Sequence, residues 1–157
     1  MLRDNITGIN IDTTSSVNLV QNGDGIILFY DTSRNKMLSI TRETMSFGLN
    51  HRNIMNHRWL QTVSKIPSNI LGYKVPRNAT ITSITIQTEN LVSYAKFNIR
   101  TNGSLTNLHT TNLVTDNKII QDNLNYNINK GDYLQLFMSV ISGNVDYPLT
   151  NIEIAWR

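Results

Sequence analysis

ATITSITIQTE at residues 79–89 and SYAKFNIR at residues 93–100 are the two stretches that decide the fold class. In the second stretch, Ala95, Phe97 and Ile99 alternate with polar residues. An alternation with a period of two is typical of a β-strand that buries one face, because successive side chains point to opposite sides of the sheet. The first stretch is rich in threonine and isoleucine, whose branched side chains fit a pleated surface. We therefore predict two strands here.

The first stretch departs from this period at one place. Ile84 and Ile86 keep the alternation, whereas Ile81 lies out of phase with them. A β-bulge inserts one extra residue into a strand and so shifts the alternation of its side chains. The sequence therefore predicts a bulge near residues 82–83.

The rest of the second half of the chain has the same organisation. Five further segments alternate or carry short apolar runs, and turn residues separate them: 70–75, 105–114, 124–129, 133–141 and 151–157. Short strands at intervals of roughly 8–12 residues are the signature of a sandwich or jelly roll. No segment combines a helical period with helix caps. We predict an all-β protein in which residues 61–157 form a jelly-roll or β-sandwich domain.

The first 60 residues predict a separate N-terminal module. Residues 1–16 are polar and predict an extended arm. Residues 17–42 predict a three-stranded β-meander, because apolar runs flank the tight-turn sequence NGDG at residues 22–25. The period of two is lost in residues 43–60, where asparagines and a glycine interrupt any helix, so we predict a linker. The domain boundary is placed after residue 60.

Composition excludes several classes of protein. Only 16% of the 157 residues are charged, against about 25% in a typical soluble protein. The absence of cysteine excludes a disulfide framework and a thiolate metal site. No stretch approaches the roughly 20 apolar residues of a membrane span, and residues 1–10 do not have the pattern of a signal peptide. We expect a protein made in the cytoplasm, with no membrane partner.

Charge is concentrated in the middle of the chain. Residues 34–77 carry eight basic residues and one acidic residue, and the segment from His51 to Trp59 interleaves basic with aromatic and apolar side chains. Such a segment can contact an acidic protein surface or stack on nucleic acid bases. We favour the protein contact, because no nucleic-acid-binding module is recognisable. The candidate anchoring or interface residues are Arg34, Lys36, Arg52, Arg58 and Trp59.

The sequence offers no set of catalytic or cofactor-binding residues. It contains no Gly-x-Ser-x-Gly nucleophile elbow, and its acidic residues are scattered through turns. His51 and His57 have no nearby residue that would complete a metal site. One histidine per chain on a threefold axis could still form a three-ligand ring. We expect a protein that is not an enzyme and has no cofactor.

Four motifs resemble bacteriophage structural proteins. Residues 72–84 (GYKVPRNATITSI) resemble the sequence that opens the trimeric jelly rolls of phage fibres and of C1q/TNF-like proteins. Residues 129–134 (NKGDYL) resemble the turn before the penultimate strand of those domains, and residues 153–157 (EIAWR) resemble their terminal strand. Residues 25–39 (GIILFYDTSRNKMLS) resemble a hairpin that precedes the fibre or decoration domain in phage structural proteins.

This resemblance implies a virion protein with a C-terminal trimeric C1q/TNF-like jelly roll, as in head-fibre or capsid-decoration proteins such as those of crAss-like phages. The expected function is that of a homotrimeric head fibre or capsid decoration protein, attached through residues 1–60 to a capsid or fibre-base protein. The alternative is the receptor-binding tip of a tail fibre, whose loops at residues 103–117 and 142–148 would recognise a host-surface glycan. No catalytic residue is implied.

A trimer is also expected on physical grounds. The core of one chain is small and has no disulfide to reinforce it, so burial of further surface between protomers would add stability. The closing strand carries Ile152, Ile154 and Trp156 on one face. We expect these three residues either to form the trimer contact or to close the core of each protomer.

Overall fold

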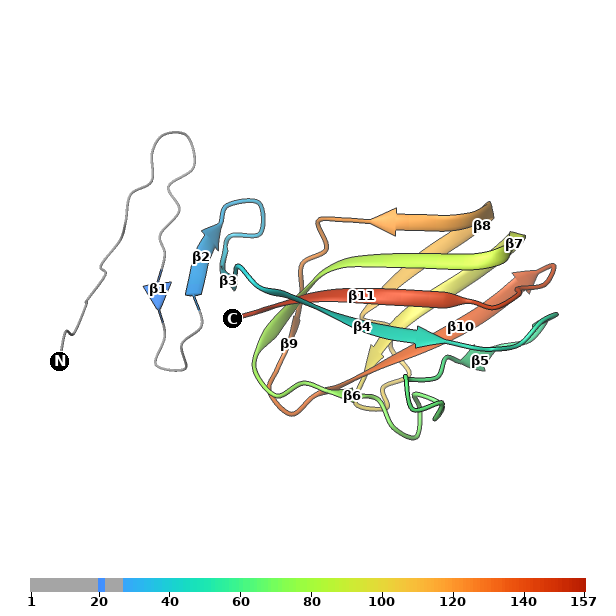
Figure 1. Cartoon of the computed structure of the whole chain (residues 1–157), viewed down its shortest axis with the longest axis horizontal. Coiled ribbons are helices and arrows are strands. Elements are labelled where there is room, and N and C mark those ends of the chain that lie inside the picture. Colours follow the sequence, from blue (N-terminus) through green and yellow to red (C-terminus); the bar gives the residue numbers. More distant parts are fainter. Residues whose placement is uncertain (1–19, 22–26) are drawn as a thin grey trace.

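The computed structural model describes residues 20–21 and 27–157, and its regular structure there consists of β-strands alone (Figure 1). The strands, in chain order, are β1 (Val20–Gln21), β2 (Ile27–Asp31), β3 (Lys36–Ser39), β4 (Arg42–Gly48), β5 (Arg58–Trp59), β6 (Tyr73–Lys74), β7 (Ala79–Thr101), β8 (His109–Gln121), β9 (Tyr126–Ile128), β10 (Tyr133–Ser142) and β11 (Leu149–Trp156). The predicted all-β class is confirmed. Within the described ranges, no helix has the length and apolar character needed to cross a membrane.

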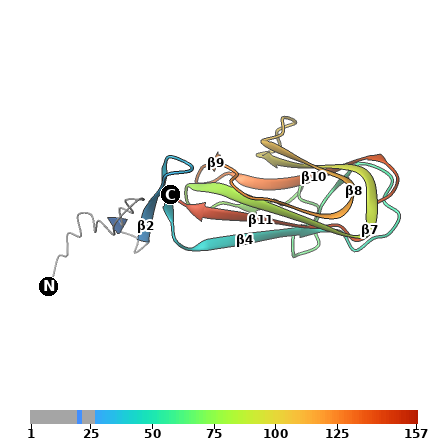
Figure 2. The same ribbon diagram turned by 90° about the horizontal axis from the view of Figure 1, so that it is seen from above.

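β7 organises the larger of the two sheets. Residues 79–87 of this strand pair with β11, and residues 94–101 pair with β10. β8 follows β7 along both halves, and the register between them shifts from Gln87 to Val92. The shift marks the place where both strands bend from one layer into the other (Figure 2). A single eight-stranded antiparallel sheet is thereby folded over into a β-sandwich.

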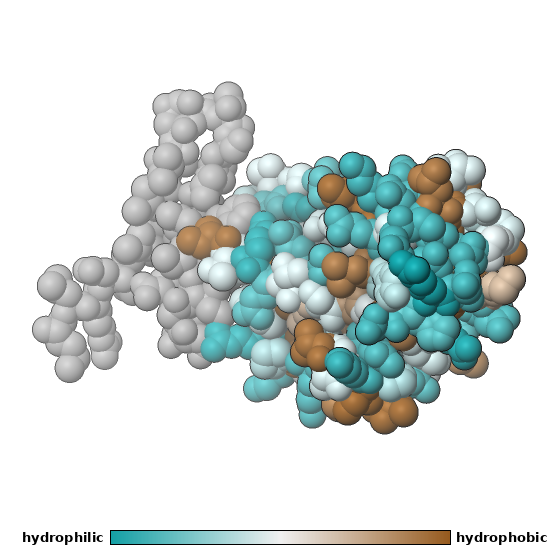
Figure 3. Space-filling view, turned by 45° about the vertical axis from the view of Figure 1, so that its right-hand side comes forward, coloured by the Kyte–Doolittle hydropathy of each residue, from teal (hydrophilic) through white to brown (hydrophobic). Residues whose placement is uncertain are grey.

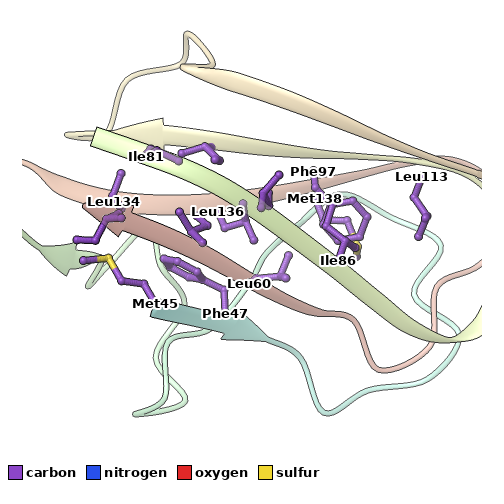
Figure 4. Packing of buried hydrophobic residues seen from close by; sticks show 14 of the residues in the cluster. Met45, Phe47, Leu60, Ile81, Ile86, Phe97, Leu113, Leu134, Leu136 and Met138 are labelled. Carbon is purple, nitrogen blue, oxygen red and sulfur yellow. The ribbon is translucent and has the colours of Figure 1, made fainter. Parts of the chain in front are cut away.

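The core fills the space between the two layers (Figure 4). Ala95, Phe97 and Ile99 of β7 are all fully buried, as their alternation predicts. Leu134 and Leu136 are fully buried beside them on the neighbouring strand β10, and Ile84 of β7 and Ile152 of β11 are fully buried on the other layer. Each fully buried Leu, Ile or Phe side chain contributes about 1.5–3 kcal/mol relative to an exposed one. The core therefore holds the two layers together without disulfides.

The predicted bulge is confirmed. Ser83 pairs with Glu153, whereas Ile154 pairs with Ile81, so Thr82 is an extra residue in β7. The side-chain alternation shifts by one residue there, which keeps both Ile81 and Ile84 in the core.

The linker predicted over residues 43–60 is wrong. β4 is a seven-residue edge strand paired with β11, and β5 pairs with β10. Met45 and Phe47 point into the core from β4. The predicted boundary after residue 60 therefore falls inside the hydrogen-bonded sandwich.

Other differences concern strand limits. The two stretches at residues 79–89 and 93–100 belong to one strand, because the chain bends at residues 88–91 without leaving the sheet. The strand predicted at 105–114 extends from His109 to Gln121, and that at 70–75 is reduced to the two residues of β6.

The predicted meander is confirmed for the described residues. β1, β2 and β3 form a separate antiparallel sheet in that order, at one end of the sandwich (Figure 1). The predicted arm at residues 1–16 and the NGDG turn at residues 22–25 lie outside the described residues.

Candidate functional site

The turn between β2 and β3 forms a buried ion pair. The Arg34 guanidinium Nη1 donates to Asp31 Oδ2 at 2.7 Å, and the two side chains are only 11% and 9% exposed. Asp31 Oδ1 accepts further hydrogen bonds from Ser33 Oγ at 2.6 Å and from the Arg34 backbone N at 3.0 Å. An aspartate at the start of a turn commonly binds its own backbone in this way. The residues Asp31 and Arg34 are called the clamp below.

The clamp joins the meander to the sandwich. Arg34 Nε donates to the backbone oxygen of Leu124 at 2.8 Å, and Nη2 donates to that of Thr82 at 3.4 Å. Thr82 is the bulge residue of β7, whose carbonyl also accepts a hydrogen bond from the Leu124 backbone N at 2.9 Å. The Thr82 carbonyl faces the gap between the end of β8 and the start of β9, where the ladder along this edge of β7 is interrupted, and it is therefore available to the clamp.

Two further contacts fix β3 to the sandwich. Lys36 Nζ donates to the side-chain oxygens of Asn125 and Asn127, the second at 2.6 Å. Ser39 Oγ accepts a hydrogen bond from the Trp156 backbone N at 3.0 Å. Leu38, between them, is fully buried. The meander is thus packed on the sandwich as well as tethered to it.

The pKa values of Asp31 and Lys36 are both lowered in the folded protein. Burial alone would raise the pKa of the Asp31 carboxyl, but hydrogen bonds from Ser33 and Arg34 and the charge of Arg34 outweigh it, so this pKa is lowered. Desolvation, together with the charges of Arg157 and Arg34, lowers the pKa of Lys36. The meander end of the sandwich is therefore locally cationic.

We predict that acid loosens the clamp. A carboxyl whose pKa is lower in the folded than in the unfolded chain stabilises the fold fully above its unfolded value, about 4, and this stabilisation is lost as the pH falls through the folded pKa. The chemical shift of the Arg34 amide, which donates to Asp31, should therefore titrate below pH 4 in an NMR experiment. Asp31→Asn should abolish this titration. A midpoint above 4 would contradict the prediction.

A second candidate site lies on the outer face of the sheet formed by β5, β10 and β7. The rings of Trp59 and Phe137 are both half-buried, and their centroids are 4.9 Å apart. The guanidinium carbon of Arg100 lies 4.4 Å from the Phe137 centroid and 5.3 Å from that of Trp59. These are cation–π distances. Trp59, Phe137 and Arg100 are called the aromatic shelf below.

Polar side chains continue this face beside the aromatic shelf. Arg100 Nε donates to Asn107 Oδ1 at 2.8 Å, and Asn107 Nδ2 donates to Asn98 Oδ1 at 2.9 Å. Thr110 Oγ1 donates to the same Asn98 oxygen at 2.9 Å. Asn98 is anchored in turn by its Nδ2, which donates to the Phe137 backbone oxygen at 3.1 Å. The chain of hydrogen bonds fixes the position of the guanidinium.

The basic residues singled out in the sequence do not form one surface. Arg34 and Lys36 lie in the meander, whereas Arg58 and Trp59 lie on β5, away from it (Figure 1). Arg52 is bonded to Glu89 at 3.0 Å and lies 5.2 Å from the Tyr147 ring. Arg58 is exposed. The segment from His51 to Trp59 therefore contributes to two separate surfaces, one beside Glu89 and Tyr147 and the other beside Phe137.

The structure places the closing strand in the interior. β11 is hydrogen bonded to β4 on one side and to β7 on the other. Ile152 and Ile154 are fully buried, and Trp156 is 7% exposed, with its Nε1 donating to Glu43 Oε1 at 2.9 Å. All three side chains belong to the core of the protomer.

Sequence reasoning missed Arg100 and Phe137. Phe137 lies between the buried Leu136 and Met138 on β10, so the alternation of this strand could have predicted an aromatic side chain on its outer face. Tyr94 and Tyr133 do not form a joint aromatic surface, because they lie near opposite ends of the β7–β10 pairing. Within the described part of the chain, no group of three or more His, Asp or Glu side chains could hold a metal ion.

Comparison with known proteins gives few relatives. No family model matches the chain, and no curated protein does. Among solved structures, PRD1 vertex protein P5 is similar over 93% of this chain and 84% of its own, with 12% identity and a TM-score of 0.46. The carbohydrate-binding module CBM36, solved with calcium and xylotriose, is similar over 75% of this chain and 100% of its own, with 12% identity and a TM-score of 0.40. No residue role is transferred from either protein.

Proposed function

We propose that this chain is a structural protein of a bacteriophage virion, a homotrimeric head fibre or capsid decoration protein attached through its N-terminal part. The observation that carries the proposal is the clamp, in which Asp31 holds Arg34 and Arg34 donates from the meander to the Leu124 carbonyl of the sandwich. If the meander attaches the protein to the virion, it must also be held firmly to the sandwich, and the clamp provides this connection. The resemblance of residues 25–39 and 72–84 to phage structural proteins supports the same function.

The surface supports a subunit contact. Apart from small separate groups, the face in Figure 3 is hydrophilic. Among the exposed apolar side chains, Leu91 is 71% exposed on the bend of β7, and Val114 and Ile120 are 50% and 64% exposed on β8. β8 pairs with β7 alone within the described residues, so its other edge is available to a second chain. Apolar side chains along a free edge favour assembly over a free monomer.

Deleting residues 1–40 tests this proposal. The deletion ends before Arg42, because a longer one would remove β4 from the sandwich. We expect the truncated protein to remain a folded trimer, with a light-scattering mass of three chains, and to be lost from purified particles of the encoding phage. The full-length chain, of 17.9 kDa, is the control. A full-length monomer in solution, or incorporation of the truncated protein, would refute the trimer or the attachment respectively.

The receptor-binding alternative is supported by a different feature. The aromatic shelf presents a cation and two rings on a sheet face that the meander does not contact.

A further inference from the structure

Arg100 is held in place but is not neutralised. Its Nε donates to Asn107, and its guanidinium packs on the rings of Phe137 and Trp59. Within the described residues, neither Nη1 nor Nη2 has a hydrogen-bond acceptor, and no carboxylate pairs with the side chain. The two terminal nitrogens of an arginine form a fork that matches a carboxylate with two parallel hydrogen bonds. Arg100 is therefore preorganised for an anion that the described chain does not supply.

Arg52 is a useful comparison, because its guanidinium has both an aromatic ring and a carboxylate as partners. Its guanidinium also lies over an aromatic ring, that of Tyr147, at 5.2 Å. Unlike Arg100, it donates to a carboxylate, Glu89 Oε1, at 3.0 Å. Arg100 thus combines a fixed guanidinium with free binding capacity, whereas Glu89 already occupies the guanidinium of Arg52.

The surroundings of Arg100 favour a ligand that carries hydroxyl groups. The sheet register places Trp59, Phe137, Asn98 and Thr110 in one row across four strands. Asn98 is only 3% exposed and is bonded within the protein, so it supports this face from beneath. The next row consists of Ser139, Lys96 and Asn112. Amides and hydroxyls both donate and accept, as sugar hydroxyls do. The half-buried indole of Trp59 offers an apolar face on which a pyranose ring can pack.

The same surroundings argue against a nucleic acid strand. A strand needs a row of cations that follows its phosphates, in addition to stacking platforms. In the two rows described above, Lys96 is the one basic residue, and its Nζ lies over the Tyr94 ring at 5.6 Å. Neutral polar side chains make up most of the face. A fixed guanidinium and one lysine among neutral polar groups match a ligand that is rich in hydroxyls and carries few negative charges.

We propose that this face binds an acidic saccharide, whose carboxylate pairs with the guanidinium fork of Arg100 while a pyranose ring packs on Trp59. The inference goes beyond the proposed structural function and does not depend on trimer formation or on virion attachment. It assigns glycan recognition to a sheet face rather than to the loops at residues 103–117 and 142–148.

The test uses the full chain and two pairs of probes: 3′-sialyllactose with lactose, and trigalacturonate with its neutral galactose trimer. NMR titration at millimolar concentration should shift the Trp59 indole and Arg100 Nε signals with an acidic probe, with dissociation constants at least tenfold lower than for the neutral probes. Arg100→Lys keeps the charge but loses the fork, and should weaken binding on the order of tenfold. Trp59→Ala should weaken it further.

Arg52→Lys is the matched control, because Arg52 also lies over an aromatic ring but is already paired. It should leave saccharide binding unchanged. Amide spectra of each variant establish that it is folded, and Arg100→Gln serves as a second variant at the key position. Equal binding of acidic and neutral probes, binding that survives both Arg100 variants, or no shift with either acidic probe would overturn the proposal. Tighter binding of oligothymidylate than of either acidic sugar would also overturn it.

Discussion

Arg34→Met should release the meander while the sandwich stays folded. The substitution leaves the Asp31 carboxylate, only 9% exposed, without its cation, and it removes the donor to the Leu124 carbonyl. Removing one partner of a buried ion pair costs about 3–5 kcal/mol, because the remaining charge is desolvated and unpaired. We expect this loss in the free energy of local opening, since no core residue of the sandwich is changed.

Hydrogen exchange followed by mass spectrometry would measure the effect. Peptides that cover residues 27–39 should exchange faster in the variant by about two to four orders of magnitude, and peptides from β7 and β10 should not change. Arg52→Met is the matched control, because the Arg52–Glu89 pair is 61% and 50% exposed and should contribute at most about 1 kcal/mol. Asp31→Asn combined with Arg34→Met should cost less than Arg34→Met alone. Unchanged exchange in residues 27–39 would show that the clamp does not hold the meander.

Gly72→Ala should destabilise the sandwich itself. A Cβ atom at this position would lie 2.3 Å from the Leu134 carbonyl oxygen and 3.0 Å from Tyr133 Cδ2. The first atom is backbone of β10, a strand whose neighbouring side chains fill the core, so it cannot move aside cheaply. The segment before β6 would have to separate from β10, with loss of the pairing of Tyr73 with Leu134. We expect a loss of about 3 kcal/mol or more in the free energy of unfolding.

Gly131→Ala is the comparison for this variant. Gly131 has a φ of +91°, and a Cβ atom at this position would meet no other atom within 4 Å, so only backbone strain should appear. That strain is about 1–2 kcal/mol. Urea unfolding curves of both variants give the two values. Equal losses would mean that the close approach at Gly72 is not the cause of its effect. The expected difference also gives a physical reason for glycine as the first residue of the motif at residues 72–84.

The sequence predicted the fold well where one strand buries one face. Ala95, Phe97 and Ile99 show this, and so does the bulge at Thr82, where the phase of the isoleucines changes. The prediction failed at residues 88–91, the bend of β7. A short polar segment between two alternating stretches has the same sequence pattern whether the chain turns into a new strand or bends within one strand. The prediction also failed at β4, although Met45 and Phe47 are two residues apart and both buried.

The candidate sites were predicted less completely, for a different reason. Arg34 and Trp59 were singled out from the residues around them in the chain. Their partners, Leu124 and Arg100, are brought to them by tertiary pairing between segments far apart in the sequence. In the sequence, Arg100 has the pattern of an ordinary solvent-facing residue of a strand. Its special position follows only from the register of β10 with β5 and β7.

The central position of β11 has a consequence for how the protein is made. This strand lies between β4 and β7. The described part of β4 therefore cannot pair with its neighbouring strand, and the first half of β7 has β8 and β9 on one edge but nothing on the other, until residues 149–156 have been synthesised. The edge of β7 that pairs with β10 and β11 in the folded protein has no partner strand until these two strands have been made, although apolar side chains lie along the length of β7. Pairings so distant in sequence slow folding. During translation, the nascent chain therefore carries an unsatisfied apolar hairpin of β7 and β8, which is the form in which a chaperone would meet it.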